Sequence, residues 1–146
     1  MDFLTGLKIS SSGMAANKKR MGAISSNIAN AQTTRTAEGG PYRKKEVVFG
    51  AEPARETFSE MLEGELGENA QTVQATEVLS TDKPPVLKYE PIHPEANEQG
   101  YVAYPDINMM EEMANMIATS RAYEANLAAF NTTKSMAVKA LEIGNK

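Results

Sequence analysis

The placement of proline is the feature of this 146-residue chain that most constrains its fold. All seven prolines lie between Pro41 and Pro105, and the two flanks contain none. Because proline lacks the backbone N–H and its ring clashes with the preceding helical turn, two proline-free flanks around a proline-rich middle suggest two helices joined by a non-helical segment. We therefore expect an α+β chain: a coiled-coil-like pair of terminal helices, residues 1–35 and 106–146, around a β-rich insert, residues 36–105.

The N-terminal flank has the spacing of an amphipathic helix over residues 3–30. Its apolar residues fall on alternating steps of four and three, a heptad-like row. The row consists of Phe3, Leu7, Met14, Met21, Ile24 and Ile28, with Ser10 and Asn17 in the gaps. A row this thin makes a marginal helix that needs partners to cover it. The alternative is an ordinary core-facing helix of a globular domain.

The C-terminal flank returns to a helical pattern after Pro105 and ends near Gly144. Asp106 or Asn108 can cap this helix, because a short polar side chain accepts the free N–H groups of the first turn. The negative charges of Glu111 and Glu112 in the first turn are favourable, because the N-terminal end of a helix dipole is positive. The predicted row consists of Met109, Met113, Met116, Ser120, Tyr123, Leu127, Phe130, Lys134, Ala137 and Leu141.

The middle of the chain reads as short strands separated by turns. Strands are predicted at 42–49, 71–80, 86–90 and 101–104, with a short helix at 54–66 that Gly64 weakens. The insert contains few apolar residues, so it cannot bury a large core and should be partly extended.

Composition excludes most kinds of chemistry. The chain has no cysteine and one histidine, so a thiol nucleophile and a cysteine- or histidine-rich metal site are ruled out. His93 has no serine or carboxylate at a spacing that suggests a triad, and a turn histidine is the better interpretation. The formal net charge of −4 argues against nucleic acid, and no apolar run is long enough for insertion into a membrane. We expect no enzyme activity, cofactor or metal.

Four motifs in order resemble the bacterial flagellar axial proteins of the rod and hook. Residues 11–16 (SSGMAA), 20–21 (RM) and 26–31 (SNIANA) are similar to the N-terminal pattern of that family. Residues 120–126 (SRAYEAN) with 133–136 (TKSM) are similar to its C-terminal pattern. Residues 39–45 (GGPYRKK) and 93–108 narrow the resemblance to the proximal rod. Residues 50–80 carry no motif of the family.

The resemblance implies a structural subunit of the flagellar basal-body rod. Such subunits polymerise through their terminal helices, neighbours cover the exposed rows, and the rod passes torque across the periplasm from the inner-membrane ring to the distal rod and hook. Implied partners are other copies, neighbouring proximal and distal rod proteins, the rod–ring junction protein and the flagellar type III exporter, which cleaves no signal peptide. The N-terminus, with Asp2 and Lys8, has no secretory pattern.

The family motifs also single out Asn27, Asn30, Arg121 and Asn126. A buried asparagine can fix helix register as a polar seam residue does in coiled coils, although Asn27 and Asn30 could simply end the helix. Three other functions remain open at this point: another rod or hook subunit, a soluble helical adaptor or chaperone of flagellar export, and a small hydrolase that uses His93.

Overall fold

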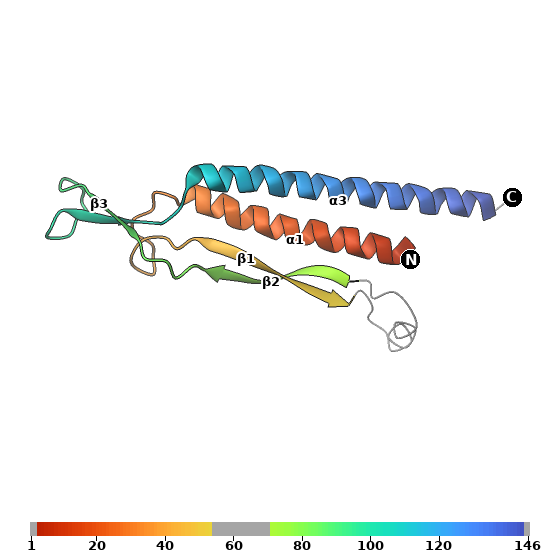
Figure 1. Cartoon of the computed structure of the whole chain (residues 1–146), viewed down its shortest axis with the longest axis horizontal. Helices are drawn as coiled ribbons and strands as arrows, with labels where there is room; N and C mark the ends of the chain where they lie inside the picture. Colours follow the sequence, from red (N-terminus) through yellow and green to blue (C-terminus); the bar gives the residue numbers. More distant parts are fainter. Residues whose placement is uncertain (1–2, 54–70, 145–146) are drawn as a thin grey trace.

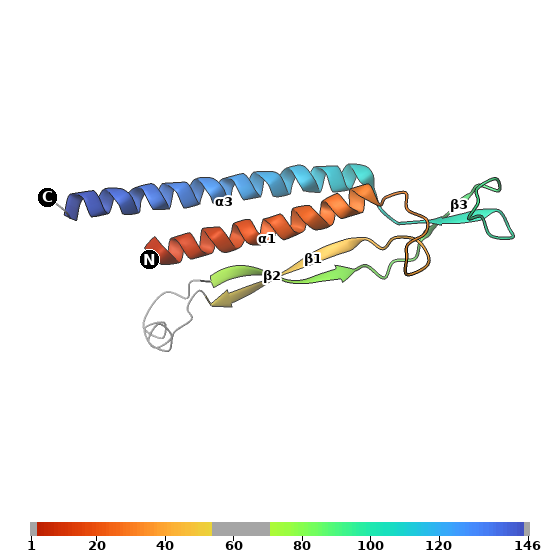
Figure 2. The ribbon, with the colours of Figure 1, turned by 180° about the vertical axis from the view of Figure 1, so that it is seen from behind.

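The computed structural model describes residues 3–53 and 71–144 and has an elongated α+β fold. Helix α1 (Phe3–Ala29) and helix α3 (Met109–Gly144) lie side by side and antiparallel, and the hairpin of strands β1 (Lys45–Pro53) and β2 (Gln71–Ser80) runs along α1 (Figures 1 and 2). A second hairpin, β3 (Val86–Tyr89) and β4 (Tyr101–Tyr104), projects beyond the helices (Figure 1). The predicted pair of helices around a β-rich insert is confirmed.

Helix α3 begins where the sequence indicated. The Asn108 Oδ1 accepts hydrogen bonds from the backbone N–H groups of Met110 (3.1 Å) and Glu111 (3.4 Å), so Asn108 rather than Asp106 is the N-cap. Helix α1 ends at Ala29, where the chain turns into the loop that leads to Tyr42. The predicted short helix at 54–66 lies outside the described residues.

The two hairpins are separate antiparallel sheets of two strands each. In the first, Lys45 pairs with Ser80 and Pro53 with Gln71, and the register shifts between Val48 and Phe49. Thr76 is the extra residue of this bulge, because Val48 pairs with Glu77 and Phe49 with Ala75. A bulge increases the local twist of a strand pair.

Little apolar surface is buried within the chain. The buried apolar side chains of the described residues are Ala16, Ala23 and Ile24 of α1 and Val102 of β4. Large apolar side chains remain exposed on both helices, including Leu4, Met113, Ile117 and Leu141. A soluble monomer rarely leaves a connected apolar surface of this kind without a partner.

Candidate assembly site

The paired helices meet in a regular antiparallel register. Gly6 faces Thr133 and Gly13 faces Asn126, while Asn27 donates a hydrogen bond to Glu112. Gly6 and Gly13 are seven residues apart on α1, and their partners Thr133 and Asn126 are seven residues apart on α3. Asn27 and Glu112 each lie fourteen residues further along the contact. This heptad spacing is that of a coiled coil.

The row of α3 that contacts α1 is more polar than the sequence pattern suggested. The side chains on this face, buried or half-buried in the structure, are Glu112, Met116, Thr119, Tyr123, Asn126, Phe130, Thr133 and Ala137. They follow steps of four and three, so they form one continuous face of the helix. Met116, Tyr123 and Phe130 belong to it as the sequence indicated, whereas Met113, Leu127 and Leu141 stay exposed.

On α1, the six apolar residues singled out from the sequence differ in burial. Ile24 is buried and Phe3 is exposed. Leu7, Met14, Met21 and Ile28 are half-buried. A single chain therefore covers only part of this row, and the rest remains available for contacts with other chains.

One side of the helix pair, where strand β1 lies against it, contains a groove. This inner groove, about 300 Å³ in volume, lies between α1, α3 and β1; Arg20 and Ala23 line it from α1, Glu111 and Asn115 from α3, and Phe49 from β1. The Arg20 guanidinium lies 5.8 Å from the centre of the Phe49 ring. Because a helix turns 100° per residue, Leu7 and Met14 of α1 and Met113 and Ile117 of α3 look away from this groove.

We call the side opposite the inner groove the open face. Its residues from α1 and α3 are Leu4, Leu7, Ser11, Met14, Lys18, Met21, Met113, Ile117, Leu127 and Val138. The hairpin does not cover it, because Ser12 and Lys19 bind β2 from another side of α1: Ser12 Oγ accepts from Val73 N (3.2 Å), and Lys19 Nζ donates to the Ala75 carbonyl (3.3 Å). Five of the apolar residues predicted to mediate assembly thus lie on this face, which the described chain leaves uncovered: Leu7, Met14, Met21, Met113 and Leu127.

A polar clamp, formed by Asn27, Tyr42, Lys44, Lys45 and Glu112, joins α1, β1 and α3. The Asn27 side chain is 1% exposed and pairs with the backbone of Lys45 as a neighbouring strand would: Nδ2 donates to the carbonyl (2.9 Å) and Oδ1 accepts from the N–H (2.8 Å). Nδ2 also donates to Glu112 Oε2 (3.0 Å), and Tyr42 OH donates to Oδ1 (3.1 Å). All four hydrogen-bonding positions of the carboxamide are therefore used.

Glu112 is the buried charge of the clamp, with 1% of its surface exposed. Lys44 Nζ lies 2.9 Å from Glu112 Oε1 and 3.8 Å from Glu46 Oε1. Burial lowers the pKa of Lys44, but the hydrogen bond to Glu112 and the charges of Glu112, Glu111 and Glu46 outweigh it, so the pKa rises above 10.5. A buried carboxylate needs such a partner, because an uncompensated charge in the interior is strongly destabilising.

The family-motif residues have different places in the structure. Asn27 lies in the clamp and Asn126 lies against Gly13, both between the helices. Asn30 instead ends α1, since its Nδ2 donates to the Ser26 carbonyl (2.9 Å) and its Oδ1 accepts from Thr33 Oγ1 (3.2 Å). Arg121 is exposed on α3. The sequence could not show that Asn27 pairs with a strand.

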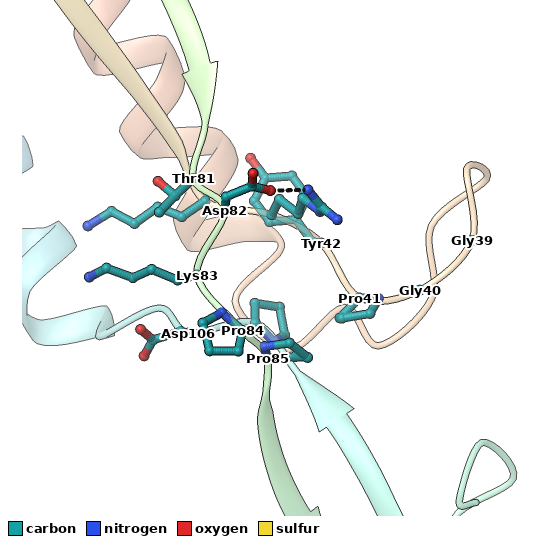
Figure 3. A pocket seen from close by; sticks show the side chains of 13 residues that line it. Gly39, Gly40, Pro41, Tyr42, Thr81, Asp82, Lys83, Pro84, Pro85 and Asp106 are labelled. Carbon is teal, nitrogen blue, oxygen red and sulfur yellow. Dashed lines mark hydrogen bonds and ion pairs between the residues drawn. The ribbon is translucent and has the colours of Figure 1, made fainter.

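Prolines gather at the joint between the helical part and the second hairpin. A hollow of about 270 Å³ is lined by Pro41, Pro84, Pro85 and Pro105 together with Tyr42, from three separate passes of the chain (Figure 3). An ion pair between Arg43 Nη1 and Asp82 Oδ1 (2.6 Å) spans two of these passes. Proline restricts φ, so this convergence stiffens the joint.

The second hairpin holds His93 in a turn. Its Nδ1 accepts a hydrogen bond from the backbone N–H of Glu95 (3.2 Å), and its ring lies edge-on to Tyr104 at 6.5 Å. The Tyr104 hydroxyl donates to Glu90 Oε2 (2.9 Å), and this bond, burial and the charges of Glu90 and Glu95 raise the pKa of Tyr104.

Within residues 3–53 and 71–144, the structure groups no set of three or more acidic or histidine side chains that could hold a metal ion. None of the helices that it describes combines the length and the hydropathy required to cross a membrane.

Comparisons with known proteins agree with this geometry. The family model "Flagella basal body rod protein" matches residues 7–35, and the model "Flagellar basal body rod FlgEFG protein C-terminal" matches residues 98–143. These two matches cover most of α1 and nearly all of α3, together with β4.

Curated relatives match almost the full length of the chain. Three are named flagellar basal-body rod protein FlgC: those of Bacillus subtilis (38% identity, covering 94% of this chain and 95% of the relative), Borreliella burgdorferi (36%, 98% of each) and Salmonella typhimurium (36%, 99% of each). These relatives are structural rod proteins, so they do not favour an export adaptor, a chaperone or a hydrolase. The chain therefore belongs to the flagellar basal-body rod protein family and is a structural subunit of the basal-body rod.

Proposed function

We propose that this rod subunit polymerises through α1 and α3 and that the resulting shaft transmits torque from the inner-membrane ring to the distal rod and hook. The observation that carries the proposal is the open face, where Met113 is 50% and Ile117 57% exposed. Burial of apolar surface contributes about 25 cal/mol per Å², so covering this face with neighbouring subunits is a source of assembly energy.

The clamp supports the mechanical part of the proposal. A subunit that passes torque must hold its parts in fixed positions, and Asn27 and Glu112 tie α1, α3 and β1 together through a fully hydrogen-bonded network. Such buried networks favour one arrangement of a core over others when every member is satisfied.

The proposal extends to the partners that the family implies. They are other copies of the chain, neighbouring proximal and distal rod proteins and the rod–ring junction protein, with delivery by the flagellar type III exporter without cleavage of a signal peptide. The rod would then span the periplasm.

The test adds charge to the open face. Met113→Lys with Ile117→Lys should abolish swimming and hook formation, because two ammonium groups would have to be buried between subunits. The matched control is Ala114→Lys with Ala118→Lys, two exposed positions one residue further along the same helix that turn away from the open face. The control should swim.

The measurements are swimming in soft agar and electron microscopy of purified basal bodies from cells with an epitope-labelled chain. Intact hooks and normal swimming in the Met113→Lys, Ile117→Lys strain would refute polymerisation through this face. Recovery of the labelled wild-type chain only in the cytosol would refute its place in the rod altogether.

A further inference from the structure

The open face contains a row of α3 side chains that no part of the described chain covers. This outer flank includes Met113, Ile117, Leu127 and Val138, which are 50%, 57%, 40% and 47% exposed, with the exposed side chains of Glu124 and Asn131 among them. These six residues fall on one side of the helix, about a quarter turn from the row that contacts α1. An overlying helix therefore fits best with small side chains opposite most of the bulky ones and a cation opposite Glu124.

The outward row of α1 has these properties at the same heptad spacing. It consists of Leu4, Lys8, Ser11, Ala15, Lys18, Gly22, Ser25 and Ala29, and every one of them is exposed. Apart from Leu4 and the two lysines, these side chains are small, so another helix can approach closely. Lys18 supplies the positive charge in the middle of the row.

We propose that α1 of a second copy covers the outer flank of α3, antiparallel to it, with Lys18 opposite Glu124; this inference rests on the proposed polymerisation. Because the two helices are antiparallel, residue numbers rise along α1 as they fall along the facing α3. The Lys18–Glu124 pair therefore determines the other pairs. Ala15 of the second copy then lies opposite Leu127, Ala29 opposite Met113, and Ser25 opposite Ile117. Leu4 lies opposite Val138. Three of the four bulky residues of the outer flank thus meet small residues of the α1 row, and the fourth, Val138, meets Leu4.

The pairing is self-extending. Each copy offers its outer flank to the next copy and its outward α1 row to the one before, so the two surfaces differ and the contact can repeat from copy to copy. The helices within one chain are also antiparallel, so a second copy in the same orientation presents its α1 in the required direction. A contact of α3 with α3 would instead make a closed dimer.

The absence of cysteine from the sequence allows a direct test by crosslinking. A full-length chain with Ala15→Cys and Leu127→Cys should form a ladder of disulfide-linked dimers, trimers and longer species in basal bodies isolated from oxidised cells. The control is Ala15→Cys with Ala122→Cys, because Ala122 lies on the side of α3 turned toward the inner groove. The control should give no ladder.

Charge reversal in the full-length chain, expressed in cells, supplies a second test. Lys18→Glu and Glu124→Lys should each lower the yield of rods about tenfold, because each places like charges opposite one another. The double variant should return to within about threefold of wild type. Glu98→Lys, in the loop of the second hairpin, is the control and should change nothing.

The outcomes separate this inference from the proposed function. A motile strain with the Ala15→Cys, Leu127→Cys chain in its rods but no ladder would overturn the pairing and leave polymerisation intact. Crosslinks that stop at the dimer would indicate the closed contact instead. If both single charge variants lose rods and the double variant does not recover, Lys18 and Glu124 are not opposite one another.

Discussion

At the scale of single residues, Asn27 holds the most demanding position in the molecule. A carboxamide that pairs with a strand backbone and also binds a carboxylate cannot be replaced by another side chain without leaving some partner unsatisfied. Aspartate lacks the two donors, and alanine lacks every polar atom. The Asn27 position is therefore fixed by hydrogen bonding, although its helical periodicity alone would suit an apolar residue.

Replacement of Asn27 should destabilise the isolated chain. Asn27→Ala leaves the Lys45 N–H and one oxygen of Glu112 without their partners, and we expect a loss of about 2–4 kcal/mol in the free energy of unfolding. Urea unfolding followed by circular dichroism measures it. Asn30→Ala is the control: Asn30 makes only local bonds at the helix end, so its loss should stay below about 1 kcal/mol. Equal losses in the two variants would contradict the clamp.

Lys44 gives the clamp a dependence on pH. Its pKa in the folded chain is raised above 10.5, so the charged ammonium stabilises the fold below 10.5, and this contribution is lost as the pH rises through the raised value. The difference in unfolding free energy between wild type and Lys44→Met should therefore be constant from about pH 7 to 9 and shrink at higher pH. Lys8→Met, at an exposed position, should show no such trend. If the difference between wild type and Lys44→Met instead grew above pH 10.5, the inferred direction of the Lys44 pKa shift would be wrong.

At the scale of elements, the terminal helices and most strands were predictable from local signals. The absence of proline favours helices in the two flanks, Asn108 supplies a capping side chain, and β-branched runs such as Val47–Val48 indicate strands. The contact row of α3 was not predictable in full, because periodicity favours the bulkier of two adjacent residues. At Met113 and Leu127 the structure instead uses the neighbouring polar residues Glu112 and Asn126 for the contact.

The clamp could not be predicted for a different reason. Asn27, Lys45 and Glu112 come from three segments that are far apart in the sequence, and only the packed fold brings their atoms together. Local patterns report helix ends and apolar faces, whereas a buried polar network depends on the exact placement of every partner. The apolar open face was easier to anticipate, because it repeats along two single helices.

The glycines of α1 provide a test of helix packing. A Cβ at Gly13 would lie 2.9 Å from Asn126 Nδ2, whereas a Cβ at Gly22 would meet nothing within 4 Å. Gly22→Ala should therefore raise the free energy of unfolding by about 0.5–1 kcal/mol, the usual gain in a helix interior. Gly13→Ala should lose this gain, and Gly13→Leu should separate the helices. Equal gains for both alanine variants, measured by urea unfolding, would show that the helices do not approach closely at Gly13.

At the scale of the whole molecule, α3 is longer than α1. The part of α3 that extends past α1 can serve assembly without contributing much to the stability of one chain. Gly6 faces Thr133, so Phe3 at the start of α1 lies level with Met136, and α3 continues for eight residues past this point, of which only Ala137 belongs to the contact row (Figure 1). These residues include Leu141 and Ile143, which are 75% and 78% exposed. No other described residue of the chain covers Leu141 and Ile143, so their apolar surface is available to a neighbour.

Removal of this extension should therefore separate the two properties. A chain truncated after Met136 should keep its helical circular dichroism and unfold within about 2 °C of the full-length chain, since each kilocalorie of lost stability would shift the transition by only a few degrees. The same truncation should prevent rod completion, seen as basal bodies without hooks and non-motile cells. A truncation after Ala122 is the contrast, because it removes Asn126 and Thr133 from the contact with α1 and should lower the melting temperature as well. Normal hooks in cells with the chain truncated after Met136 would show that the residues beyond Met136 take no part in assembly. A large drop in the melting temperature of the same truncated chain would show that these residues stabilise the single chain.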